Sequence, residues 1–184
     1  MIKASQTAAS CRPLILVAED DPSHRFVLGR VFAAIGADAR LQFVANGREL
    51  LDYLDGCRPA QGTAQGSTQG TAQQIAVASP NQWPHFVLLD LHMPKMGGID
   101  TLKAIRADRS LRALPAIIFS SSDQPHHIDQ AYASGANAYL VKVGDFKELV
   151  RHLRGLVAFW LQSARLPGAS GIYHSGSRLS GTLS

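Results

Sequence analysis

Residues 86–98 constrain the fold of this chain more than any other stretch. Four apolar residues, 86–89, are followed directly by Asp90, and Pro94, Gly97 and Gly98 come soon after it. A short apolar run bounded by turn residues is typical of a strand buried on both faces of a sheet. Asp90 is therefore expected at the carboxyl end of a central strand, the edge at which α/β sheets bind ligands. A carboxylate placed there requires a compensating positive charge.

Apolar runs alternate with helical patterns along the rest of the chain. The expected strands are residues 14–18, 40–45, 86–89, 115–120 and 138–141. Phe26, Val27, Val31, Phe32 and Ile35 recur at helical spacing, and similar patterns follow each later strand. This alternation predicts an α/β fold: a doubly wound, five-stranded parallel sheet with helices on both faces.

The ends of several helices are also marked in the sequence. Pro22 suits the first turn of the first helix, and Gly36 is expected to end it. Asn46 with Glu49, and Asp145 with Glu148, have the spacing of capping boxes. The last helix is expected to run through Trp160.

Length and local composition indicate one folded domain with three loosely ordered segments. The 184 residues, 46% of them hydrophobic, suffice for a single core, which we place at residues 13–162. Residues 1–12 are expected to be a flexible N-terminus and residues 163–184 a disordered tail. Residues 58–82 contain a Gln-, Gly- and Thr-rich repeat with little apolar surface, so we predict a flexible low-complexity insertion there.

Charge and cysteine content exclude several classes of protein. The net charge is +4, and Lys and Arg form no run, so we expect no nucleic-acid partner and no membrane association. Cys11 and Cys57 have neither C-x-x-C nor metal-site spacing, which favours reduced thiols in the cytoplasm. No signal peptide or membrane-spanning run is recognised.

Five polar residues are expected to meet at one edge of the sheet. Glu19 and Asp20 follow the first strand, Asp90 the third, Ser120 ends the fourth, and Lys142 follows the fifth. Neighbouring carboxylates repel each other unless a cation is present, and oxygen ligands without a His or Cys cluster favour Mg²⁺. A metal ion, an ammonium and a carboxylate nucleophile together suit phosphoryl transfer, with an acyl phosphate on Asp90 as product.

The sequence resembles the CheY-like receiver domain of two-component response regulators. The resemblance is carried by residues 17–22 (VAEDDP), 88–98 (LLDLHMPKMGG), Ser120 and 138–142 (AYLVK), and it covers about residues 13–160. It implies the flavodoxin-like strand order 2-1-3-4-5, the order that such doubly wound domains share.

The resemblance also implies a role for each acidic residue. Asp90 would accept a phosphoryl group from a phosphohistidine on a partner sensor kinase. Asp20 would bind Mg²⁺ directly, Glu19 mostly through water, and the backbone carbonyl of His92 would complete the protein ligands together with Asp90. The chain would then be a phosphoacceptor that gains and loses its own phosphoryl group, and not a turnover enzyme.

Three further residues receive roles by the same resemblance. Ser120 and Lys142 would hold the phosphoryl oxygens, and Ser120 would move together with Tyr139 as the switch. The sequence departs from the family after Lys142, where Val143 replaces the usual proline.

A narrower resemblance is to single-domain regulators paired with phytochrome-type sensor histidine kinases. It rests on the long segment before the third strand, the absence of proline after Lys142, and the ending at residues 157–167. This resemblance implies a bacterial phytochrome kinase as partner. Residues 156, 157 and 159–161 give the last helix apolar side chains on more than one face, so we expect a homodimer formed through the C-terminal helix. Output is expected by protein–protein contact. A dehalogenase-type phosphatase is rejected because His92 occupies the place of its second aspartate. A receiver-like binding scaffold that is never phosphorylated is the alternative.

Overall fold

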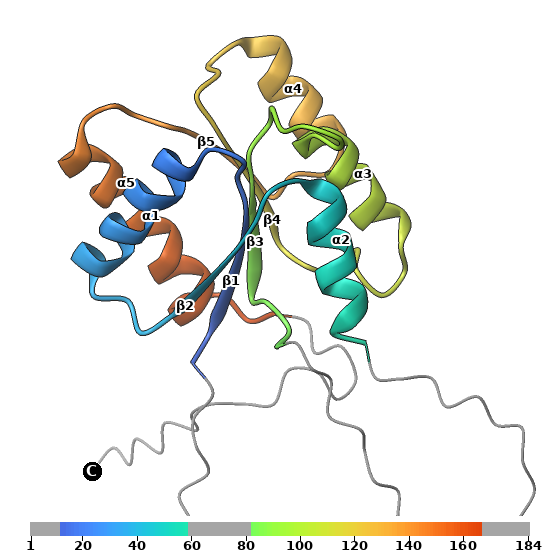
Figure 1. Cartoon of the computed structure of the whole chain (residues 1–184), viewed down its shortest axis with the longest axis horizontal. Helices are drawn as coiled ribbons and strands as arrows, with labels where there is room; N and C mark the ends of the chain where they lie inside the picture. Colours follow the sequence, from blue (N-terminus) through green and yellow to red (C-terminus); the bar gives the residue numbers. More distant parts are fainter. Residues whose placement is uncertain (1–11, 59–81, 167–184) are drawn as a thin grey trace, which may run out of the picture.

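The computed structural model describes residues 12–58 and 82–166 (Figure 1). The predicted flexible N-terminus, the low-complexity insertion and the C-terminal tail fall almost entirely outside these residues. The domain limits at 13 and 162 therefore stay predictions.

A parallel sheet of five strands forms the centre of the described part, in the order β2-β1-β3-β4-β5. The strands are β1 (Leu14–Ala18), β2 (Arg40–Val44), β3 (Phe86–Leu89), β4 (Ala116–Ser120) and β5 (Ala138–Val141). The predicted fold class and strand order are confirmed. Each predicted strand is present, with bounds that differ from the prediction by no more than one residue.

Helices cover both faces of the sheet (Figure 1). The helices α1 (Pro22–Ile35) and α5 (Phe146–Ala158) pack together on one face. The other face carries α2 (Gly47–Gly56), α3 (Gly98–Ala107) and α4 (Pro125–Ala133). A π-helix, η1 (Phe159–Ser163), continues α5, so Trp160 lies in a wider helical turn than the predicted α-helix. Among the described residues, no helix is both long and apolar enough to cross a bilayer.

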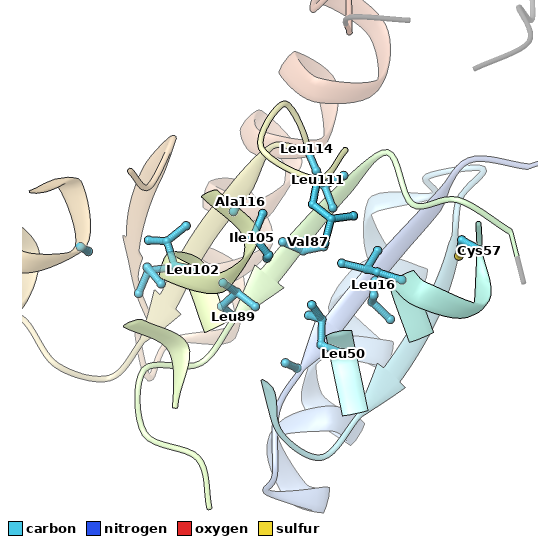
Figure 2. Close-up of a cluster of buried hydrophobic side chains, with 14 of the residues drawn as sticks. Leu16, Leu50, Cys57, Val87, Leu89, Leu102, Ile105, Leu111, Leu114 and Ala116 are labelled. Atoms are coloured by element: carbon cyan, nitrogen blue, oxygen red, sulfur yellow. The ribbon is translucent and has the colours of Figure 1, made fainter. Parts of the chain in front are cut away.

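Alternate residues of β1, β3 and β4 enter two separate cores. On β1, Leu16 and Ala18 join the core beneath α2 and α3, whereas Ile15 and Val17 join the core beneath α1 and α5. Figure 2 shows the first of these cores, in which Leu16 lies among side chains of α2, α3 and β3. Burial on both faces explains why these three strands read as continuous apolar runs, whereas the partly buried edge strand β2 alternates apolar with polar residues.

The apolar face of α1 differs from the one that the sequence pattern indicated. Phe26 is 67% exposed and Val27 is 38% exposed, whereas Leu28, Val31 and Phe32 are buried. Residues three, four and seven apart share one face of a helix, so a core face that includes Leu28, Val31 and Phe32 turns Phe26 outward. The helical spacing noted in the sequence thus includes Phe26 and Val27, which are exposed, and omits Leu28, which is buried.

The predicted caps are present, with one difference in detail. Gly36 ends α1 with a φ of 69°, in the left-handed region that favours glycine. The Asn46 side chain accepts the Glu49 N–H at 3.1 Å, but the Glu49 carboxylate accepts the N–H of Ala45 and not that of Asn46. At α5, the Asp145 carboxylate accepts the Glu148 N–H at 2.8 Å.

The two chain segments that flank residues 59–81 are held together. The Tyr53 hydroxyl donates to the Gln82 carbonyl at 3.0 Å, and the Cys57 thiol lies 3.5 Å from the same oxygen. Burial raises the pKa of Cys57 to about 11, so this thiol stays protonated and remains a donor near neutral pH.

Shortening the intervening segment is therefore expected to leave the fold intact. Replacing residues 59–81 with a linker of about six Gly and Ser residues should change the free energy of unfolding by about 1 kcal/mol or less, because loop-closure entropy varies slowly with length. Urea denaturation of the two proteins measures the difference. A loss of several kcal/mol would show that the removed residues contribute to the core.

Candidate functional site

Three carboxylates meet at the carboxyl edge of the sheet, as predicted. Glu19 and Asp20 follow β1 and Asp90 follows β3, and each offers an oxygen within 4.8 Å of the other two. Glu19 is buried, the Asp90 side chain is 11% exposed, and Asp20 is exposed to solvent. The cluster therefore opens to solvent on one side, and its oxygen donors fit a hard divalent cation such as Mg²⁺.

The register of the sheet brings these acids together. β1 and β3 are neighbours, and Ala18 lies opposite Leu89, so the next residue of each strand emerges at the same level. The Asp90 N–H continues the ladder by donating to the Ala18 carbonyl at 2.9 Å. The Asp90 carboxylate in turn accepts the Leu91 N–H at 2.7 Å, which fixes its orientation.

Lys142 bridges two of the three acids. Its Nζ lies 2.6 Å from Oε2 of Glu19 and 3.2 Å from Oδ2 of Asp90. The side chain is 11% exposed and passes over the Phe119 ring. Lys142 thus supplies the positive charge that the position of Asp90 required.

The pKa of Asp90 is raised above that of an ordinary aspartate. Burial is the largest cause, and the nearby Glu19 carboxylate adds to it, whereas Lys142 opposes the rise. The ionised form of Asp90 is therefore less favourable in the folded protein than in water.

The turn after Asp90 depends on a close backbone contact. A Cβ at Gly98 would lie 2.3 Å from the Asp90 carbonyl oxygen, so no side chain fits there without a backbone shift. The Gly98 N–H donates to the Leu91 carbonyl at 3.0 Å. The start of α3 at Gly98 thus packs directly against the backbone of Asp90 and Leu91.

Ser120 and Tyr139 are connected through Ser122. Ser120 is fully buried, and its Oγ accepts the Ser122 N–H at 3.2 Å. The Tyr139 hydroxyl donates to the Ser122 carbonyl at 2.8 Å. Ser120 ends the strand next to β3, so the structure places it at the predicted edge of the sheet.

The side chain of His92 reaches the same region from the turn after β3. Its ring centroid lies 5.4 Å from that of His127, whose Nδ1 lies 2.7 Å from the Ser122 Oγ. Burial, His126 and His92 together lower the pKa of His127. This link could not be predicted from the sequence, because no local pattern relates the start of α4 to the turn after β3.

The first turn of α1 makes two further contacts with the site that were not predicted from the sequence. His24 Nδ1 lies 3.2 Å from Oε1 of Glu19, and Arg25 Nε donates to the Glu19 carbonyl at 2.6 Å. Pro22 marked the start of the helix, so the position of His24 in its first turn could have been deduced. The orientation of the His24 side chain toward Glu19 could not have been deduced from the sequence.

Comparison with known proteins shows the family of this chain. Residues 15–154 match the family described as response regulator receiver domain. The chain belongs to the response regulator receiver family. The predicted resemblance is thereby confirmed for most of the receiver's length.

Solved structures place this receiver near single-domain regulators of light signalling. It is 35% identical to response regulator RPA3017, which acts in red light signaling of R. palustris, with 85% of this chain and 99% of that chain covered and a TM-score of 0.67. It is 26% identical to the bacteriophytochrome response regulator RtBRR, with 85% and 84% covered and a TM-score of 0.56. The predicted resemblance to phytochrome-associated regulators is thus confirmed.

A curated relative of this receiver has a different regulatory setting. The probable methanogenesis regulatory protein FilR2 of Methanothrix harundinacea (strain 6Ac) is 28% identical over 155 residues, which are 84% of this chain and 88% of that protein. Similar receivers therefore serve different regulated processes.

Proposed function

We propose that this receiver accepts a phosphoryl group from the phosphohistidine of a partner sensor kinase onto Asp90 in the presence of Mg²⁺. The observation that carries the proposal is the placement of three carboxylates around one opening, with Lys142 bridging Glu19 and Asp90. Asp20, Glu19, Asp90 and the His92 carbonyl would hold Mg²⁺, which when bound neutralises charge on the phosphoryl oxygens.

In the transfer itself, covalent bonds change only between the phosphohistidine of the kinase and Asp90. A carboxylate oxygen of Asp90 attacks phosphorus, an O–P bond forms, and the P–N bond to the kinase imidazole breaks. The bonding electrons leave on the imidazole nitrogen, which takes a proton. Lys142, already 3.2 Å from Asp90, pairs with the oxygens of the transferred group. Hydrolysis of the acyl phosphate by water later restores Asp90.

The same charge change would operate the switch. Phosphorylation adds roughly two negative charges at the mouth of the sheet. The Ser120 hydroxyl would donate to a phosphoryl oxygen, which alters the backbone around Ser122. The Tyr139 hydroxyl, which donates to the Ser122 carbonyl, would then exchange this bond and turn inward.

The proposed kinase is a bacterial phytochrome. RPA3017 acts in red light signaling and RtBRR is a bacteriophytochrome response regulator, which supports this choice. The second candidate function, an unphosphorylated binding scaffold, does not require the costly grouping of three acids around a lysine.

Incubation with acetyl phosphate and Mg²⁺, followed by intact mass measurement, tests the proposal. We expect the gain of one phosphoryl group, which chelation of Mg²⁺ prevents. No gain under any condition, and none from a phytochrome kinase, would favour the scaffold.

A homodimer through the C-terminal region stays a prediction, and one substitution tests it. Phe159 is 54% exposed and packs against Trp160 beside a cavity of about 540 Å³ between β5 and α5. At concentrations well above micromolar we expect a dimeric mass by light scattering, and Phe159→Asp should give a monomer because it places a charge in the apolar contact. Phe26→Asp on α1, where Phe26 is 67% exposed, is the matched control and should stay dimeric. A monomeric wild type would contradict the prediction.

A further inference from the structure

We propose that His24 is a positioning residue for Glu19, holding one oxygen of this buried carboxylate so that the other can serve a divalent cation. The inference rests on the proposed function, because it assigns the cation to the acidic cluster. It adds a residue outside the set of acids, serine and lysine that defines the predicted site.

The two oxygens of Glu19 have different partners. Oε2 pairs with Nζ of Lys142 at 2.6 Å. Oε1 lies 3.2 Å from Nδ1 of His24 and accepts the Asp21 N–H at 3.3 Å. Lys142 also contacts Asp90, so its bond to Oε2 can be exchanged without leaving the ammonium unpaired. Both partners of Oε1, the Asp21 N–H and the His24 ring, belong to the short segment directly after Glu19, and His24 Nδ1 also lies 3.8 Å from Oδ2 of Asp21.

The first turn of α1 fixes His24 in this position. Asp21 is the N-cap, and its carboxylate accepts the Ser23 N–H at 2.7 Å. Pro22 occupies the first helical turn, and Arg25 in the same turn donates to the Glu19 carbonyl at 2.6 Å. The turn thus holds Glu19 by both its side chain and its main chain. His24 is 47% exposed, so its contact with a buried carboxylate is not explained by core packing.

Hydrogen-bond chemistry determines which nitrogen of His24 acts. An ionised carboxylate only accepts hydrogen bonds, so Nδ1 of His24 must carry the proton that it donates to Oε1. With Oε1 held, the carboxylate cannot rotate freely to follow Lys142. Oε2 would therefore already be oriented toward a cation held by the acidic cluster, whether directly or through water.

His24 contacts the carboxylate of Glu19 and is not itself one of the expected cation ligands. The group of side chains with ligand atoms within 4.8 Å of one another contains Glu19, Asp20 and Asp90, and in the described part of the chain His24 does not join it. Groups that orient a metal ligand change metal affinity by about 10- to 100-fold when they are removed.

The test compares Mg²⁺ binding by full-length variants in isothermal titration calorimetry. His24→Ala should bind Mg²⁺ about tenfold more weakly than wild type. His24→Asn should bind within about twofold of wild type, since its amide nitrogen can replace Nδ1 as donor. The control His126→Ala changes an exposed histidine on α4 and should have no effect. Thermal unfolding confirms that each variant is folded.

A second measurement needs no metal. In ¹⁵N NMR of the metal-free protein, His24 should show a protonated Nδ1 that is hydrogen-bonded, and Glu19→Ala should abolish this hydrogen bond. If wild type binds no Mg²⁺, the proposed function fails. If wild type binds Mg²⁺ and His24→Ala binds it equally well, the role of His24 alone is overturned. Equal weakening by Ala and Asn, or a bare Nδ1 in wild type, also overturns it.

Discussion

Replacing Asp90 with asparagine is expected to abolish phosphoryl incorporation completely. The amide lacks the charged oxygen that attacks phosphorus, and the other two acids do not replace it: Glu19 is buried against Lys142 and His24, and Asp20 is expected to bind the cation. Intact mass after incubation with acetyl phosphate and Mg²⁺ should therefore show no gain.

The control for this experiment is another aspartate. Asp100→Asn, at an exposed position in the first turn of α3, should leave incorporation unchanged. A phosphoryl group that persists in Asp90→Asn, located by peptide mapping on Glu19 or Asp20, would contradict the assignment of Asp90.

Asp90→Asn should also unfold less readily than wild type when no metal is present. Burial raises the pKa of Asp90 in the folded state, so its ionised form is less favourable there than in the unfolded chain. At neutral pH the asparagine removes this cost. As the pH falls through the folded and then the unfolded pKa, the wild-type carboxyl also becomes neutral, and the advantage should disappear. Urea denaturation at neutral and acidic pH measures both effects.

Replacing Lys142 with methionine is expected to change stability, metal binding and phosphorylation in different directions. Without metal, Glu19 and Asp90 would lose the ammonium that separates them, so we expect the free energy of unfolding to fall by about 3 kcal/mol. Mg²⁺ should bind about tenfold more tightly, since no cation competes with it, and should restore stability. Phosphoryl incorporation should be about a hundredfold slower, because the oxygens lose their partner.

Calorimetry, urea denaturation and the rate of mass gain measure the three effects. Lys147→Met, on the exposed surface of α5, is the matched control and should change none of them. Weaker Mg²⁺ binding by Lys142→Met would contradict the view that Lys142 and the cation compete for the same oxygens.

The features that the sequence predicted well are those encoded in short, uninterrupted patterns. The run before Asp90 identified a strand buried on both faces, and in a parallel sheet this also determined the edge at which Asp90 emerges. Glu19 and Asp20 followed by the same reasoning, because β1 ends directly before them.

Other features depended on contacts that no local pattern records. Phe26 fits the helical spacing of α1, but only the packing of α1 on the sheet and α5 decides that Leu28 is buried and Phe26 is not. The link from His92 through His127 to Ser122 joins segments more than 25 residues apart in the chain. The roles of the site residues in phosphoryl transfer and switching concern chemical steps, and neither a sequence pattern nor a fold records such steps.

The direction in which the strands run has a practical consequence. All five strands point their carboxyl ends toward the acidic cluster, and α2 and α5 return the chain to the other side of the sheet. The described segments therefore begin at residues 12 and 82 and end at residues 58 and 166 on the side remote from Asp90 (Figure 1). A fluorescent reporter or an affinity tag joined at any of these points would leave the mouth of the site open to an incoming kinase.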